Sequence, residues 1–181
     1  MQRKPLADAV IPDPNASYEA AMAAPTLSVD EAALVDEQLG RPSRGRSAVV
    51  HTCGHGLPTV VRVDPRLDNG TPFPTTFWST CPLLNSAIGT LEAEQFMVAT
   101  NERVTEDPAF ASAYDDAQQR LVAFRDELGA AGQLPGNPTA GGKPGHVKCV
   151  HTHAAQFLAT GDNVVGQLTV EATRPLACPG P

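Results

Sequence analysis

The chain has 181 residues, of which 41% are hydrophobic and 5% aromatic, and its formal net charge is −7 at pH 7. One domain with a core of mainly Leu, Val and Ala is expected, and the negative charge argues against non-specific nucleic-acid binding. No stretch approaches the roughly 18 apolar residues of a transmembrane helix, and no apolar segment follows Met1–Lys4 as in a signal peptide. We therefore expect a cytoplasmic protein whose four cysteines serve metal binding, catalysis or core packing rather than disulfides.

The N-terminal region divides into an arm and a first helix. Residues 1–25 are rich in Pro, Ala and Asp, show no sustained period and are predicted to form a disordered arm. Ser28 and Glu31 have the spacing of a capping box, so a helix is predicted from there to about Leu39, where Gly40 ends it.

Three short runs of β-branched and aromatic residues predict a sheet. The runs 48–50 and 59–63 flank a turn-rich segment, which is typical of a β-hairpin with Cys53 at or near its tip. A second turn is indicated by Asn69–Gly70. Residues 75–80 then predict a third strand.

Helical periodicity follows the strands. Pro82 suits the first position of a helix with an apolar stripe. Residues 96–99 are predicted to be either one more short strand or the end of this helix. Asp107 is expected to cap a longer amphipathic helix, which Gly129 ends.

The last strong element is predicted to be a helix that starts near His146 and ends at Gly161. Residues 171–181 are expected to be a flexible tail with Cys178 exposed to solvent. The whole pattern predicts one α+β domain over residues 26–170, with a small, mostly antiparallel sheet packed on about four helices.

Seven of the nine Cys and His residues lie in two short windows, 51–55 and 146–153. The windows are almost a hundred residues apart, so only the fold could bring them together. If it does, a nitrogen and sulfur ligand set for a transition metal, or a reactive thiol site, is expected.

The second window allows two ligand geometries. On a helix, His146, Cys149 and His153 share one face, whereas on a strand Cys149, His151 and His153 would do so. Because the apolar stripe favours a helix, we predict Cys149 and His153 as metal ligands, completed by Cys53, with zinc as the expected ion. The chain has no C-x₂-C pair, so a structural role for these residues is the alternative.

Cys81 is a candidate nucleophile. It precedes the predicted helix at Pro82, where the helix dipole and free amides lower a thiol pKa. A histidine from the other windows would serve as base, and we assign Cys81 and His151 as the catalytic pair. The alternative is that Cys81 is a small buried core residue.

A basic, glycine-rich segment predicts anion binding. Residues 141–145 run into the last predicted helix, and such a backbone can hold an anion at a helix N-terminus. We predict that Lys143, Lys148 and Arg66 contribute positive charge to this site. The segment does not have the spacing of a phosphate-binding Walker A loop, and a flexible linker is the alternative.

Several short segments match a known pattern when they are taken in chain order. They are Gln38–Arg41, Pro42–Gly45, Cys53 with Gly56–Pro58, Pro65–Thr75, Thr80–Pro82, Leu91–Glu92, Gly141–Pro144 and Val147–His151. Over roughly residues 28–166 this order resembles a bacterial family known only as domain of unknown function number 501. The resemblance implies no activity, but it adds weight to Cys53, Arg66, Lys148, Cys149 and His151. Many members of that family carry histidine where this chain has Gln156, a departure from a histidine-rich metal site.

Two functional hypotheses follow. The first is a small cytosolic enzyme or ligand-binding protein with a Cys/His site, either metal-binding or thiol–imidazole, beside a basic pocket for a small anion. The second is a non-catalytic module that binds another protein and uses its Cys and His residues structurally. Neither hypothesis involves a membrane or nucleic acid.

Overall fold

The computed structural model describes residues 16–130, 134, 136, 138–140, 144–174, 176, 178 and 180. Within these residues the chain has the predicted α+β fold and a three-stranded antiparallel sheet, but it has seven α-helices rather than the predicted four or so. In chain order the elements are α1 (Tyr18–Ala23), α2 (Val29–Leu39), β1 (Ser47–Thr52), β2 (Pro58–Val63), β3 (Phe77–Ser79), α3 (Pro82–Ala93), α4 (Phe96–Glu106), α5 (Pro108–Arg125), the π-helical turn η2 (Asp126–Ala130), α6 (Val150–Thr160) and α7 (Val164–Ala172). No described helix combines the length and apolarity needed to cross a membrane.

The sheet has the order β1-β2-β3, and both pairs are antiparallel. The predicted hairpin is confirmed, because the backbone N–H of Cys53 donates to the carbonyl of Leu57, 2.9 Å away, and starts the turn after β1. The central strand is buried on both faces. Residues on β2 therefore pack alternately against two different layers.

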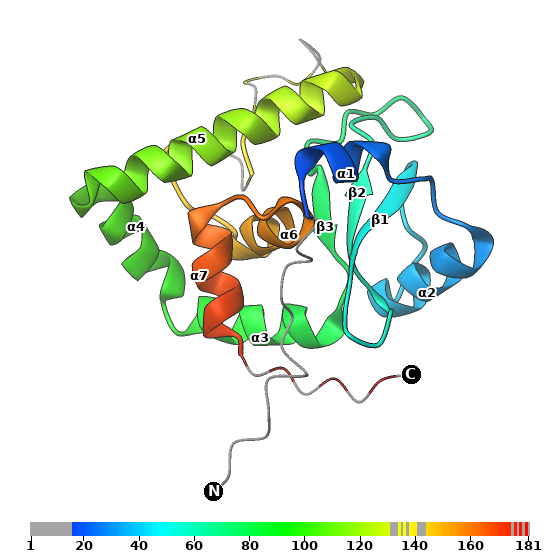
Figure 1. Ribbon diagram of the computed structural model, residues 1–181, viewed down its shortest axis with the longest axis horizontal. Helices are drawn as coiled ribbons and strands as arrows, with labels where there is room; N and C mark the ends of the chain where they lie inside the picture. The colour runs from blue at the N-terminus through cyan, green and yellow to red at the C-terminus, as the bar shows by residue number, and fades with distance from the viewer. Residues whose placement is uncertain are drawn as a thin grey trace, which may run out of the picture.

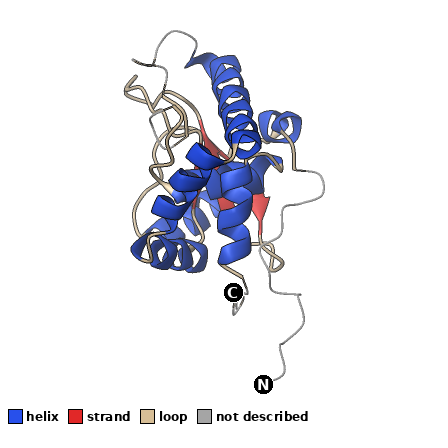
Figure 2. Ribbon diagram, turned by 90° about the vertical axis from the view of Figure 1, so that its left-hand side faces the viewer, coloured by secondary structure: helices blue, strands red, loops and turns tan. Residues whose placement is uncertain are grey.

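Helices cover both faces of the sheet. Val61 and Val63 pack with Val35 of α2, whereas Val60 belongs to the main core together with Val150 of α6. Figure 1 shows α2 on one side of the strands and α6 on the other. In the turned view of Figure 2 the strands lie among the helices. This burial of apolar faces is what holds the layers together.

Helix α1 corrects the prediction of an arm without regular structure for Tyr18–Ala23. Ser17 caps it, and Ala21 is only 2% exposed. The buried guanidinium of Arg62 donates to two carbonyls at its C-terminal end. These contacts stabilise a helix too short to form in isolation, and a local pattern does not show them. The predicted arm residues 1–15 lie outside the described residues.

The predicted caps of the middle helices are confirmed. The Asp107 side chain accepts hydrogen bonds from two backbone amides of α5, and Cys81 is the N-cap residue of α3. Both alternatives predicted for residues 96–99, a short strand or the end of the preceding helix, are wrong, because these residues begin a new helix. Gln95 adopts a left-handed conformation with φ 66°, which reverses the chain after α3 and starts the separate helix α4.

The last two helices differ most from the prediction. Helix α6 ends at Gly161 as expected, but it begins at Val150 rather than near His146. Helix α7 was not predicted, and it is capped by Asn163, whose side chain accepts from an amide of its first turn. The thiol of Cys178 is half-buried rather than exposed.

Candidate functional site

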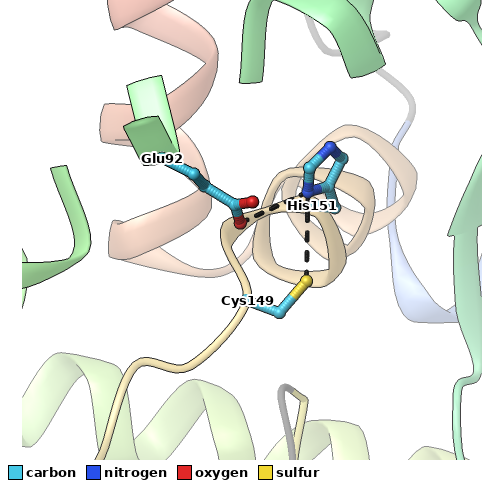
Figure 3. A group of neighbouring side chains, drawn as sticks. All are labelled: Glu92, Cys149 and His151. Atoms are coloured by element: carbon cyan, nitrogen blue, oxygen red, sulfur yellow. Dashed lines mark hydrogen bonds and ion pairs between the residues drawn. The ribbon is translucent and has the colours of Figure 1, made fainter. Parts of the chain in front are cut away.

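Three side chains with metal-binding or catalytic chemistry meet at the N-terminus of α6. Cys149 is its N-cap residue, His151 lies in its first turn, and Glu92 comes from the last turn of α3. Cys149 Sγ lies 3.9 Å from His151 Nδ1, and Glu92 Oε1 lies 3.3 Å from the same nitrogen (Figure 3). Within the described residues, they form the one group of three Cys, His or acidic ligand atoms that all lie within 4.8 Å of one another.

Glu92 joins the two helices. Its Oε1 accepts a hydrogen bond of 3.1 Å from the backbone N–H of Val150, which opens α6. A carboxylate is favoured here because the first amides of a helix have no partner within the helix. The same bond places the carboxylate beside His151.

Side chains of α4 and α5 hold residues 146 and 147, just before α6, outside the helix. The side-chain amide of Asn101 on α4 accepts from the N–H of Val147 at 2.9 Å and donates to its carbonyl at 2.8 Å. The hydroxyl of Tyr114 on α5 donates to the carbonyl of His146. These bonds satisfy the backbone of the segment outside a helix and so determine where Cys149 lies.

The two nitrogens of His151 face different surroundings. Nε2 lies 3.3 Å from the backbone carbonyl of Asn85, an acceptor that can pair only with a protonated nitrogen. In the neutral ring the proton therefore sits on Nε2, and the Nδ1 lone pair faces Cys149 and Glu92. One sulfur, one nitrogen and one oxygen ligand atom thus lie within 4.8 Å of one another.

The pair of Cys149 and His151 is electrostatically coupled. The hydrogen bond with His151 lowers the pKa of the Cys149 thiol, against the effect of burial. The hydrogen bond with Cys149, and the charge of Glu92, raise the pKa of His151. Both pKa shifts favour the deprotonated sulfur of Cys149, which is the form that binds metals and attacks electrophiles.

Cys149 borders a partly open hollow that residues of β3 and α6 line. Two adjoining cavities of about 360 and 290 Å³ share Thr75, Phe77, Trp78, Cys149 and Thr152 as lining residues. The smaller one is also lined by His151. The site thus has a space beside it in which a small molecule can be held.

The structure does not bring the predicted metal ligands into one group. Cys53 lies at the hairpin tip and His153 is fully buried, and neither belongs to the group around Cys149. Because α6 begins at Val150, the expected helical face through His146 does not exist. Burial lowers the pKa of His153 to about 3, and its ring contacts the ring of Tyr114 and the side-chain amide of Asn163.

Cys81 lies at the start of α3 as expected, but its thiol pKa is raised rather than lowered. It caps α3, but burial raises the pKa of its thiol more than the two nearby amides lower it. Burial thus works against the expected thiolate character of Cys81, whereas the thiol pKa of Cys149 is lowered. Cys81 is not in the group that contains His151, so their roles as a catalytic pair stay a prediction.

The structure describes two of the three predicted anion-binding residues, Arg66 and Lys148. Arg66 donates to the carbonyl of Gly70, 3.0 Å away, within its own turn. Lys148 is exposed next to Cys149, and Lys143 lies outside the described residues. Neither Arg66 nor Lys148 lines the hollow beside Cys149. Anion binding by this trio stays a prediction.

Sequence reasoning missed Glu92 as a site residue. A signal was present, because Asn85 and Glu92 are seven residues apart on α3 and so share one helical face. Both contact His151, through the carbonyl of Asn85 and the carboxylate of Glu92. Two polar residues at this spacing on one face of a helix are consistent with a common partner.

Comparison with known proteins adds one finding. The model of a family described as "Protein of unknown function (DUF501)" matches residues 49–171 of the chain. No curated protein and no solved structure matches. The matched range contains all three residues of the group at α6.

Proposed function

The chain belongs to the DUF501 family of proteins of unknown function, and we propose that Glu92, Cys149 and His151 bind one divalent transition-metal ion. Zinc is the preferred ion, because its usual ligands in proteins are thiolate, imidazole and carboxylate. Three protein ligands leave a fourth position, which we assign to a small molecule held in the hollow that Cys149 and His151 line. The protein is then a small metal-dependent enzyme or ligand-binding protein.

One observation carries this proposal. Cys149 Sγ and Glu92 Oε1 approach the same nitrogen of His151, while its other nitrogen faces a backbone carbonyl. In a nucleophile–histidine–carboxylate triad the thiol and carboxylate use opposite ring nitrogens. In a metal site the ligands gather on one side of the ring, and the outer N–H is held by a carbonyl or carboxylate.

The distances agree with a single ion. With metal–ligand bonds of about 2.1 to 2.3 Å, a tetrahedral centre separates nitrogen from oxygen by about 3.4 Å and sulfur from nitrogen by about 3.6 Å. The corresponding separations here are 3.3 Å for Nδ1 to Oε1 and 3.9 Å for Sγ to Nδ1. Small side-chain movements suffice to close the remaining difference.

Metal analysis of the purified, reduced protein tests the proposal. We expect about one zinc per chain in the wild-type protein, strongly reduced in Cys149→Ser. Cys53→Ser is the matched control, because Cys53 is also half-buried but lies outside the group. Wild-type protein that takes up no zinc, cobalt or iron, or loss of metal in Cys53→Ser alone, would contradict the proposed site.

A thiol nucleophile is the second candidate function. Its support is that Cys149 caps α6, lines the hollow and lies 3.9 Å from a histidine nitrogen. Without metal uptake, faster alkylation of Cys149 than of Cys53 by iodoacetamide in the folded protein would favour this function. Absence of metal together with thiols that react only after denaturation would instead favour a non-catalytic module.

A further inference from the structure

Apart from Cys149 and His151, the described lining of the hollow beside the proposed metal site carries no ionisable side chain. Its walls include the aromatic ring of Phe77 and the side chain of Leu121, with several threonine hydroxyls. No Asp, Glu, Lys or Arg is among the described residues that line it. A charged ligand would lose its hydration there without gaining an oppositely charged partner from these walls.

Polar atoms in these walls lack partners. Ser79 and Asn85 line the cavity that also touches His151, and their Oγ and Oδ1 atoms are buried and have no hydrogen-bond partner within the described part of the chain. Thr139 Oγ1, at the other cavity, is in the same state. Leaving such groups unpaired is costly, so a ligand that satisfies them gains affinity. Asn85 Oδ1 accepts only, and therefore requires a ligand N–H or O–H.

We propose that this hollow binds an uncharged small molecule in which an apolar group adjoins a hydrogen-bond donor, with a carboxamide as the simplest example. The donor pairs with Asn85 Oδ1 and Ser79 Oγ, the apolar group packs against Phe77 and Leu121, and the polar end faces Cys149. No covalent step is part of the proposal.

The net charge of the proposed metal site also favours an uncharged ligand. This argument rests on the proposed function, because a divalent ion bound by a thiolate, a carboxylate and a neutral imidazole has no net charge. Such a centre adds little attraction for an anion. A neutral carbonyl or amide oxygen can occupy the open coordination position of the ion without adding charge to the site.

Three matched probes test this ligand class. Benzamide is neutral and has the donor, methyl benzoate is neutral without it, and benzoate is anionic without it. Binding is followed by NMR through the indole N–H of Trp78, the one tryptophan of the chain, which borders both cavities. We expect benzamide to bind at least about tenfold more tightly than either other probe. Equal or tighter binding of benzoate would overturn the inference.

Ser79→Ala is the variant that tests the contact. It should weaken benzamide binding by about threefold to tenfold and leave methyl benzoate binding unchanged. Ser86→Ala, at an exposed serine of α3, is the control and should leave both unchanged. An identical benzamide affinity in Ser79→Ala and wild type would contradict the assigned contact.

The titrations are made on chelator-treated and on zinc-loaded protein, so that the two proposals fail separately. Benzamide selectivity in a protein that takes up no zinc supports the ligand class and contradicts the metal site. Zinc uptake with benzoate bound as tightly as benzamide supports the metal site and overturns the ligand class.

Discussion

The side-chain amide of Asn101 pairs with both backbone polar groups of Val147, two residues before Cys149. The pairing is like one rung of a β-ladder between a helix side chain and an extended segment. It takes the place of the helical hydrogen bonds that this segment would otherwise make. Asn101 therefore determines where α6 starts and where the thiol of Cys149 lies.

Asn101→Ala should destabilise the fold and loosen the site. It leaves the N–H and carbonyl of Val147 without their partner, at a cost of about 1 to 3 kcal/mol in the free energy of unfolding. We also expect weaker zinc binding, because Cys149 is no longer held in place. Urea unfolding and zinc titration measure the two effects. Asn69→Ala, which removes a side-chain bond in an exposed turn, is the control and should leave zinc affinity unchanged.

Gly166 marks the contact between α6 and α7. A Cβ atom at this position would lie 2.0 Å from the carbonyl oxygen of His153, so Gly166→Ala forces the two helix backbones apart. We expect a loss of about 3 kcal/mol or more in the free energy of unfolding. Gly89→Ala is the matched control, because Gly89 is an exposed helical glycine with open space around it. It should stabilise the protein by about 0.5 to 1 kcal/mol. A well-folded, equally stable Gly166→Ala variant would contradict the close packing.

The two tyrosines should make the fold sensitive to alkali. Burial raises the pKa of Tyr18 and of Tyr114, and the nearby charge of Asp162 adds to the effect at Tyr18. The folded protein thus keeps protons that the unfolded chain releases above about pH 10. Stability is complete below that pH and falls as pH rises, by at most about 1.4 kcal/mol per tyrosine and pH unit. Tyrosinate absorbance should appear only together with unfolding, and Tyr18→Phe should reduce the slope. Ionisation of both tyrosines near pH 10 in the folded protein would contradict this.

Glu92→Gln should separate the structural role of this side chain from its proposed role as a ligand. The glutamine keeps an oxygen that accepts from the N–H of Val150, but it loses the charge that favours a cation. In the presence of a chelator we expect a change of less than about 1 kcal/mol in the free energy of unfolding. Zinc should raise the melting temperature of the wild type and do so much less in the variant. Glu94→Gln, at an exposed neighbouring position, should behave like the wild type.

Local signals predicted much of the fold correctly. The capping box at Ser28, the hairpin around Cys53, the cap at Asp107 and the stop at Gly161 are each confirmed. Each of these depends on hydrogen bonds and backbone conformations within a few residues of the chain. Such features are specified by the identity of neighbouring residues and are visible without a tertiary structure.

The elements that were missed depend on partners distant in the chain. Helix α1 is held through Arg62, and α4 begins at the left-handed Gln95. The start of α6 is shifted from His146 to Val150 because Asn101 and Glu92 bind the backbone on either side of Cys149. A periodic pattern contains no information on which distant side chain satisfies a given amide.

By itself the sequence determined the class of fold, the starts of α2, α3 and α5, the end of α6, and the concentration of thiols and imidazoles in two short windows. Only the tertiary structure decided that Cys149, rather than Cys53 or Cys81, meets a histidine, and that the third member is Glu92. The physical reason is that a side chain's reactivity depends on its burial and on the groups within a few ångströms of it. The packing of α3 against α6 sets both.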